Sequence, residues 1–296
     1  MNNFDGVQTA WLGGKLHLNH GPIDLLLHAQ GHSGEIEIAY ENAQRCFRDV
    51  LTDLVEELPL LRTPLSKRKV FSEYKPRGTI ARQMVHACVP FRSQLLSPMA
   101  AVAGAVDDHM LAALNEKSNL QRAWVNNGGD IAFSLQAGQR FSCGLVPEVQ
   151  LADVQGKLDI KASDPVRGIA TSGWASHGQG GRSFSLGIAD AVTVLAKNAA
   201  CADVAATMIA NRVDLPEHDG IGRVAARELD PDSDLGSRRV TTHVPALSDG
   251  ECHTALDRGR RFAQQLQTSE QIFFAVLFLQ KQFVVVGNGR FIGSNE

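Results

Sequence analysis

The chain has 296 residues, of which 44% are hydrophobic and 21% are charged, and its formal net charge is −3. This composition predicts a single globular domain, which we divide into halves of roughly 1–120 and 121–296. The balanced charge leaves no basic field for nucleic acid, and no apolar run approaches the roughly 18 residues of a membrane span. We therefore expect a cytoplasmic protein with no nucleic-acid and no membrane partner.

The first hundred or so residues are predicted to form scaffold elements. A Gly-Pro turn indicates a hairpin over residues 15–29. Apolar residues three and four apart predict an amphipathic helix from Tyr40 to Leu58, and shorter helices are expected at 79–87 and 100–114. The last of these is faced with Ala and Gly, which allows another backbone to approach closely. It also carries Asp107, Asp108 and His109, which we interpret as partly exposed, with a catalytic role left open.

The segment A-W-V-N-N-G-G-D-I-A-F-S-L predicts two strands around a polar bend. The adjacent residues Gly128 and Gly129 indicate either positive φ angles or a close approach of the backbone to a bound ligand. Asn-Gly is also a favoured hairpin dipeptide, so a plain turn is an equally good interpretation. In both cases Asn127 and Asp130 place polar groups at the bend.

The stretch from Gly168 to Asp214 is predicted to organise the chain. It contains a tight turn in G-I-A-T-S-G, a polar loop, a buried strand over 191–196 and a helix over about 199–213. Asp203 and Thr207 are four residues apart, so both side chains lie on one helix face. A carboxylate and a hydroxyl are hard oxygen donors of the kind that Mg²⁺ prefers, and substrate phosphates often complete its coordination. This pattern predicts a magnesium site for a phosphate-bearing ligand.

The last third predicts a surface excursion followed by a closing unit. Residues 214–236 are polar and irregular. A strand is expected over 238–245, a helix capped by Ser248 or Asp249 over 248–267, and a hairpin over 272–286. Strands and helices alternate along the whole chain without a dinucleotide-binding, P-loop or G-x-S-x-G motif. The fold class is therefore α+β, with mainly antiparallel sheet and packed helices.

Four motifs in order carry a family resemblance: V-N-N-G-G-D-I, I-A-T-S-G, A-D-A-V-T-V-L-A and A-D-V-A-A-T. They resemble the signatures of the ApbE superfamily, the Mg²⁺-dependent FAD:protein FMN transferases once called thiamine-biosynthesis lipoproteins. The segments L-H-L-N-H-G-P-I-D-L, E-L-P-L-L-R and S-P-M-A-A-V-A-G-A resemble a cytoplasmic branch of that superfamily more closely. The resemblance runs from about Leu16 to Asp214 and implies two similar halves with a flavin-nucleotide cleft between them.

The resemblance also implies site residues. Asp203 and Thr207 would be side-chain ligands of Mg²⁺, and the backbone carbonyl of Ala170 would be a third ligand. The flavin nucleotide, FAD or FMN, would be bound by residues of the two glycine motifs and of the Ala-rich helix: Gly104, Asn127, Gly128, Gly129, Asp130, Thr171, Ser172 and Gly173.

Two departures from the transferase pattern affect the expected chemistry. Ala103 stands where the transferases carry a lysine before the glycine, and S-L-G-I-A-D replaces the segment that supplies their catalytic histidine. The loss of a general base costs about 10²–10⁴ in rate. Ser185 and Asp190 are poor substitutes near neutral pH, and His177 is the one nearby residue that could take over the role.

These observations favour an ApbE-like protein that binds a small nucleotide ligand, FAD or FMN, with Mg²⁺, without assigning its reaction. Two alternatives stay open. One is a Mg²⁺-dependent enzyme, either an FAD:protein FMN transferase or an FAD pyrophosphatase. The other is a non-catalytic accessory protein in sulfur assimilation. A homodimer is also left open.

Overall fold

The computed structural model describes residues 6–66, 69, 71–94, 96–145, 156–173, 184–287 and 291–293. The chain forms two compact units, each assembled from separate stretches of sequence. Unit 1 comprises Met1–Phe141, Lys161–Ile169 and Lys197–Val204, and unit 2 comprises Ser142–Ile160, Ala170–Ala196 and Ala205–Glu296.

Antiparallel strands form the sheet of unit 1: β1 (Gln8–Leu12), β2 (Lys15–His20), β3 (Ile23–Gln30), β4 (Arg122–Asn127) and β5 (Asp130–Leu135), in that order. β5 also pairs with the start of β8 (Gly168–Ser172) through Ile131 and Ile169. Alternate residues of β2 and β3 are buried, which fits the two-residue side-chain period of a strand. One face of the sheet therefore carries the core.

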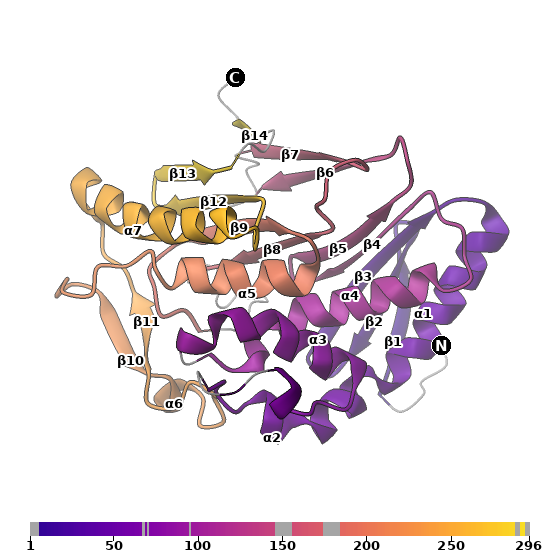
Figure 1. Ribbon diagram of the computed structural model, residues 1–296, viewed down its shortest axis with the longest axis horizontal. Coiled ribbons are helices and arrows are strands. Elements are labelled where there is room, and N and C mark those ends of the chain that lie inside the picture. The colour runs from indigo at the N-terminus through magenta and orange to yellow at the C-terminus, as the bar shows by residue number, and fades with distance from the viewer. Residues whose placement is uncertain are drawn as a thin grey trace. The chain divides into compact units, whose positions relative to one another are not determined.

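The helices of unit 1 are α1 (Ser33–Glu56), α2 (Leu58–Leu61), α3 (Thr79–Cys88), α4 (Val102–Asn115) and the first residues of α5 (Ala199–Ala210). α1 and α4 pack on the strands of the unit 1 sheet, and the other helices of the unit pack on these two or on each other (Figure 1). Short 3₁₀ helices lie at Phe71–Glu73, Val89–Gln94 and Pro98–Ala101. α4 packs against β4, β5 and α1, so it lies at the centre of the unit.

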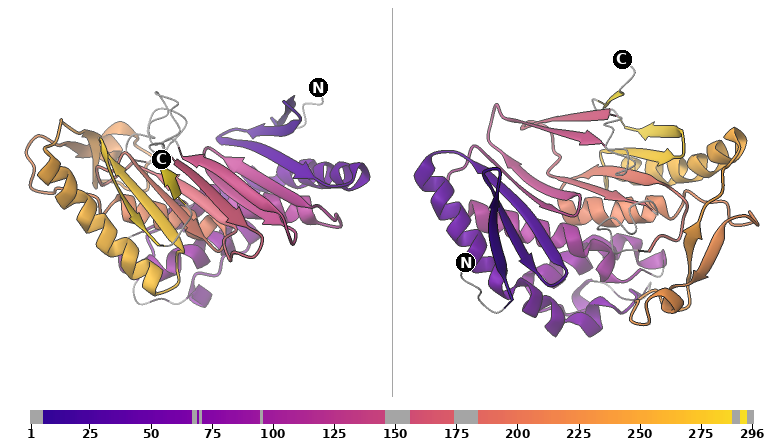
Figure 2. Two further views of the ribbon diagram at one scale, coloured as in Figure 1. Left: turned by 90° about the horizontal axis from the view of Figure 1, so that it is seen from above. Right: turned by 180° about the vertical axis from the view of Figure 1, so that it is seen from behind.

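Unit 2 is built around β9 (Ala191–Ala196), β12 (Phe274–Leu279) and β13 (Gln282–Val286), which pair in that order. Every residue of β9 and β12 is buried, and α7 (Asp249–Thr268) packs on β12 and β13 (Figure 2). α7 begins with a capping box, in which Ser248 and Glu251 satisfy each other's backbone N–H groups. The predicted cap at Ser248 is therefore confirmed.

Two smaller sheets complete the description. One contains β6 (Arg140–Leu145), β7 (Gly156–Lys161) and β14 (Phe291–Gly293), in the order β14-β7-β6. The other pairs β10 (Gly222–Ala225) with β11 (Arg239–His243), and α6 (Ala226–Leu229) follows β10. The interpretation of residues 214–236 as irregular was wrong, because β10 is stabilised by a partner that lies beyond that segment.

The predicted fold class is confirmed: the protein is α+β, with antiparallel pairing in every registered strand pair. No helix in the described part of the chain is both long and apolar enough to cross a membrane.

Candidate functional site

The site begins where the first turn of α4 touches the first turn of α5 in unit 1. A Cβ atom at Gly104 would lie only 2.3 Å from the carbonyl oxygen of Ala199, so this position requires a glycine. One turn further along α4, the Asp108 carboxylate accepts hydrogen bonds from the backbone N–H groups of Ala199 and Ala200, each at 2.9 Å. These N–H groups have no partner within α5 itself. Asp108 therefore fixes the start of α5 on α4.

Asp203 completes the junction from the other side. Its Oδ2 accepts a hydrogen bond of 3.1 Å from the backbone N–H of Gly104, and its carboxyl group is also hydrogen-bonded to Asp130. Burial raises the pKa of Asp203 to about 7, although the backbone N–H groups of Gly104 and Ala103 oppose that shift. A bound cation would favour the ionised form of such a carboxyl group.

Asp107 lies beside these groups and is fully buried. Neither of its carboxylate oxygens makes a hydrogen bond of normal geometry with the described residues, although the backbone N–H of Asn127 lies close enough to lower its pKa. Burial raises its pKa well above the usual value, and the negative charges of Asp130, Asp108 and Asp203 raise it further, while the backbone of Asn127 alone lowers it. The expectation that Asp107 is partly exposed was wrong. We call Asp107, Asp130 and Asp203 the acidic cluster.

The N-N-G-G-D segment delivers Asp130 to the acidic cluster through a tight hairpin. Asn127 pairs with Asp130, and the two glycines between them have φ angles of +65° and +111°. The Asn126 side chain accepts a hydrogen bond of 3.1 Å from the N–H of Gly129. The turn alone thus accounts for the glycine pair. A Cβ atom at Gly128 or Gly129 would meet nothing within 4 Å, so the predicted flavin contact stays a prediction.

The remaining predicted residues lie in unit 2. The Thr207 hydroxyl donates a hydrogen bond of 3.4 Å to Ser172 Oγ, which brings two of them together. Thr171 is instead hydrogen-bonded to Thr193, at 2.8 Å. Ala170 is fully buried in β8, and a Cβ atom at Gly173 would lie 2.2 Å from the carbonyl oxygen of Asp190. Close backbone packing thus explains Gly173.

The predicted magnesium ligands are distributed along α5 and β8. α5 carries Asp203 in its unit 1 part and Thr207 in its unit 2 part, and residues four apart share one face of a helix. Within the described ranges, no three His, Cys, Asp or Glu side chains form a group that could hold a metal ion. The predicted set contains a single carboxylate, so this finding leaves the set of Asp203, Thr207 and the Ala170 carbonyl a prediction.

Ser185 and Asp190, which could replace the catalytic histidine of the transferases as general base, both make hydrogen bonds to the backbone. Ser185 is buried and hydrogen-bonded to the backbone of Gly187. The Asp190 carboxylate accepts a hydrogen bond from the backbone N–H of Gln280, which engages it structurally. His177 lies outside the described residues, so its role stays a prediction.

The described residues form an α+β protein with antiparallel sheet and packed helices. A family model described as AbpE bacteria matches residues 8–290, and the chain belongs to this family. The membership confirms the resemblance that the motifs indicated.

Curated relatives share part of the sequence. A UPF0280 protein of Methanobrevibacter smithii is 37% identical over 116 residues, which are 39% of this chain and 46% of the relative. A UPF0280 protein of Methanopyrus kandleri is 36% identical over 132 residues, which are 45% of this chain and 48% of the relative. The chain thus spans about half the length of these relatives.

Solved structures show a weaker likeness. The ApbE protein of Thermotoga maritima has a TM-score of 0.44 at 9% identity, covering 95% of this chain and 96% of its own. The apo flavinyl transferase ApbE of Pseudomonas stutzeri has a TM-score of 0.41 at 12% identity, covering 97% of each chain.

Proposed function

We propose that this protein binds a flavin nucleotide, FAD or FMN, together with Mg²⁺. The observation that supports this most strongly is the acidic cluster. The negative charges of Asp130, Asp108 and Asp203 all raise the pKa of the buried Asp107 carboxyl group, which indicates that these carboxyl groups lie close together. Burial raises the pKa values of Asp107 and Asp203, so protons neutralise these carboxyl groups when no cation is bound, and a divalent cation would supply the positive charge in their place.

The donor set fits a hard cation. Asp203 would hold Mg²⁺ with Thr207, from the same face of α5, and with the carbonyl oxygen of Ala170. Asp107 and Asp130 would contribute negative charge close to Asp203 and thereby favour cation binding. When bound, Mg²⁺ supplies a Lewis acid that polarises a phosphoryl oxygen of the nucleotide.

The nucleotide would contact the hairpin turn and the T-S-G motif. Open space beside Gly128 and Gly129 leaves room for a ligand at the turn. The other proposed contacts are Gly104, Asn127, Asp130, Thr171, Ser172 and Gly173. Membership of an ApbE-like family supports a flavin as the nucleotide.

The hydrogen bonds of Ser185 and Asp190 support binding of the nucleotide without transfer of FMN. Ser185 and Asp190 are both tied to the backbone, so neither is placed to take a proton from an acceptor hydroxyl. An FAD:protein FMN transferase or FAD pyrophosphatase that uses His177 is the second candidate. A cytoplasmic accessory role in sulfur assimilation is compatible with binding alone.

Calorimetric titration of Mg²⁺ in the presence of FAD tests the metal site. In Asp203→Ala we expect the Mg²⁺ affinity to fall at least tenfold while the helical circular-dichroism signal is retained. Asp49→Ala, which removes an exposed carboxylate from α1 of the same unit, is the matched control and should bind as the wild type does. Unchanged Mg²⁺ affinity in Asp203→Ala would refute the ligand assignment.

Incubation with FAD, Mg²⁺ and a threonine-bearing acceptor peptide tests the reaction. We expect intact FAD to be recovered, with no AMP released and no FMN adduct in the mass spectrum. An adduct that disappears in His177→Ala would instead establish a transferase with a relocated base.

A further inference from the structure

The segment that follows α2 in unit 1 carries a charge opposite to that of the whole chain. Residues 62–94 contain eight Lys and Arg residues and one acidic residue, Glu73, whereas the formal net charge of the chain is −3. Four of these basic residues are exposed and form no ion pair with any described carboxylate. We call them the basic surface: Lys69, Lys75, Arg77 and Arg82.

Contacts between side chains join the basic surface into one region. The Lys69 Nζ atom lies 5.8 Å from the centre of the Tyr74 ring, and the Tyr74 backbone N–H donates a hydrogen bond of 3.1 Å to the carbonyl oxygen of Phe71. The centre of the Phe71 ring lies 5.7 Å from that of His86, which is one turn beyond Arg82 on α3. Unpaired cations grouped in one region favour an anionic partner, because such a partner offsets their mutual repulsion.

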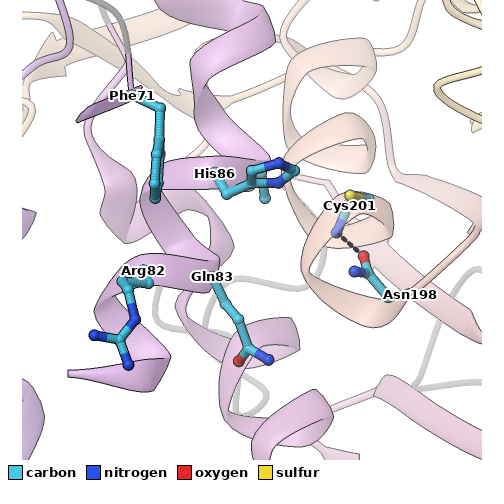
Figure 3. Close-up of a pocket in the computed structure, with 7 residues that line it drawn as sticks. Phe71, Arg82, Gln83, His86, Asn198 and Cys201 are labelled. Carbon is cyan, nitrogen blue, oxygen red and sulfur yellow. Dashed lines mark hydrogen bonds between the residues drawn. The ribbon is translucent and has the colours of Figure 1, made fainter. Parts of the chain in front are cut away.

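The surroundings of the basic surface favour a polypeptide as this partner. No large apolar side chain in the described part of residues 62–94 is exposed, so nothing there would insert into a membrane. The rings of Phe71 and Tyr74 are half-buried and contacted by neighbouring side chains, which leaves no open platform for stacked bases. Carboxylate groups match the forked geometry of arginine. A depression of about 240 Å³ beside Arg82, between α3 and the start of α5, gives room for one apolar side chain (Figure 3).

Unit 2 presents a polypeptide segment of this chemistry. Residues 227–234 contain four acidic residues and one basic residue. Glu228, Asp230 and Asp232, which we call the acidic turn, are exposed, and Leu229 between them is 48% exposed. The backbone N–H of Asp232 donates a hydrogen bond of 3.0 Å to Oδ1 of Asp230. The acidic turn therefore holds its shape before it binds anything, which lowers the entropic cost of binding.

We propose that the acidic turn of one copy of this chain binds the basic surface of a second copy. The carboxylates of the acidic turn would pair with the cations of the basic surface, and Leu229 would enter the depression beside Arg82. Each copy carries both surfaces, so a two-fold dimer makes this contact twice. The doubling matters, because a single exposed ion pair contributes little. None of these residues belongs to the proposed flavin and magnesium site, so the proposal goes beyond that function and does not rest on it.

Sedimentation velocity of the purified chain at low and high salt tests the proposal. We expect a dimer in about 0.05 M NaCl whose dissociation constant rises by about tenfold or more in about 0.5 M NaCl, since salt screens exposed charges. Arg82→Glu and Asp232→Lys should each be monomeric, because each sets like charges against each other in both contacts. Lys117→Glu, the same kind of charge reversal at an exposed position of unit 1, is the matched control and should remain dimeric.

Mixing the two monomeric variants is the decisive measurement. In a heterodimer of Arg82→Glu with Asp232→Lys, one contact pairs the two reversed charges and the other contact is native, so the mixture should dimerise. Lys75→Glu mixed with Glu228→Lys is a second pair with the same expectation, and circular dichroism checks that every variant is folded. A monomeric wild type at low salt, a dimer that survives both reversals, a mixture of folded variants that stays monomeric, or assemblies larger than a dimer would overturn the proposal.

Discussion

Replacing Gly104 with alanine should destabilise the protein, although alanine is the better helix former. The new Cβ would lie 2.3 Å from the carbonyl oxygen and 2.4 Å from the carbonyl carbon of Ala199, and backbone atoms cannot rotate away as a side chain can. α4 and α5 would have to separate by about 1 Å, and overpacking of this kind costs typically about 1–3 kcal/mol. The hydrogen bond from Gly104 to Asp203 would lengthen as well, and a bond to a charged group contributes about 1.5–3 kcal/mol.

The helix-propensity gain of about 1 kcal/mol offsets only part of this loss, so we expect a net decrease of about 1.5–5 kcal/mol in the free energy of unfolding. Urea denaturation followed by circular dichroism measures it. Gly34→Ala is the matched control, because Gly34 also lies in the first turn of a unit 1 helix but has open space beside it. That variant should gain up to about 1 kcal/mol. If both variants are equally stable, the close contact between α4 and α5 does not exist.

Two further predictions concern Asp108 and the hairpin. Burial raises the pKa of the Asp108 carboxyl group from 3.8 to about 6, so the folded protein binds the carboxyl proton more tightly than the unfolded chain does. The free energy of unfolding should therefore fall by roughly 3 kcal/mol as pH rises from about 4 to 6. Urea midpoints of the metal-free protein should show that Asp108→Asn loses this part of the pH dependence, and parallel pH profiles would contradict the burial of that carboxylate. Gly129→Val and Gly138→Val both place valine at a positive φ with no steric contact, so each should cost about 1–3 kcal/mol. Only Gly129→Val should also weaken FAD binding in the folded fraction, and equal affinities in the two variants would argue that the hairpin is purely structural.

The sequence predicts the helices, strands and caps whose signals lie within a few neighbouring residues. The buried strand at 191–196 and the start of the following helix at Ala199 agree with β9 and α5. The capping box at Ser248 depends on residues three apart in the chain, which the sequence displays directly. Helix α1 begins at Ser33, seven residues before the predicted stripe starts at Tyr40, because residues 33–38 are exposed or half-buried and add no fully buried position to the apolar pattern.

The sequence does not predict features that depend on residues far away in the chain. β10 exists because β11 pairs with it, and hydrophobic periodicity within 214–236 gives no sign of that. Asp107 lies three residues after Gly104 on the Ala-rich helix, a spacing that places both near one face, but nothing in the sequence says that this face meets two other carboxylates. The one available signal was an acidic residue on a small-residue face.

The reciprocal bonds between α4 and α5 also determine the order in which the molecule can be completed during synthesis. Gly104 and Asp203 are 99 positions apart, and Asp108 and Ala199 are 91 apart. At roughly 5–20 residues per second, α4 emerges from the ribosome about 5–20 s before its partner. Throughout that interval Asp107 can remain hydrated, and Gly104 has no contact with the backbone of Ala199. Most residues of unit 1 come from the beginning of the chain, yet its last packing step must wait until about two thirds of the protein has been made.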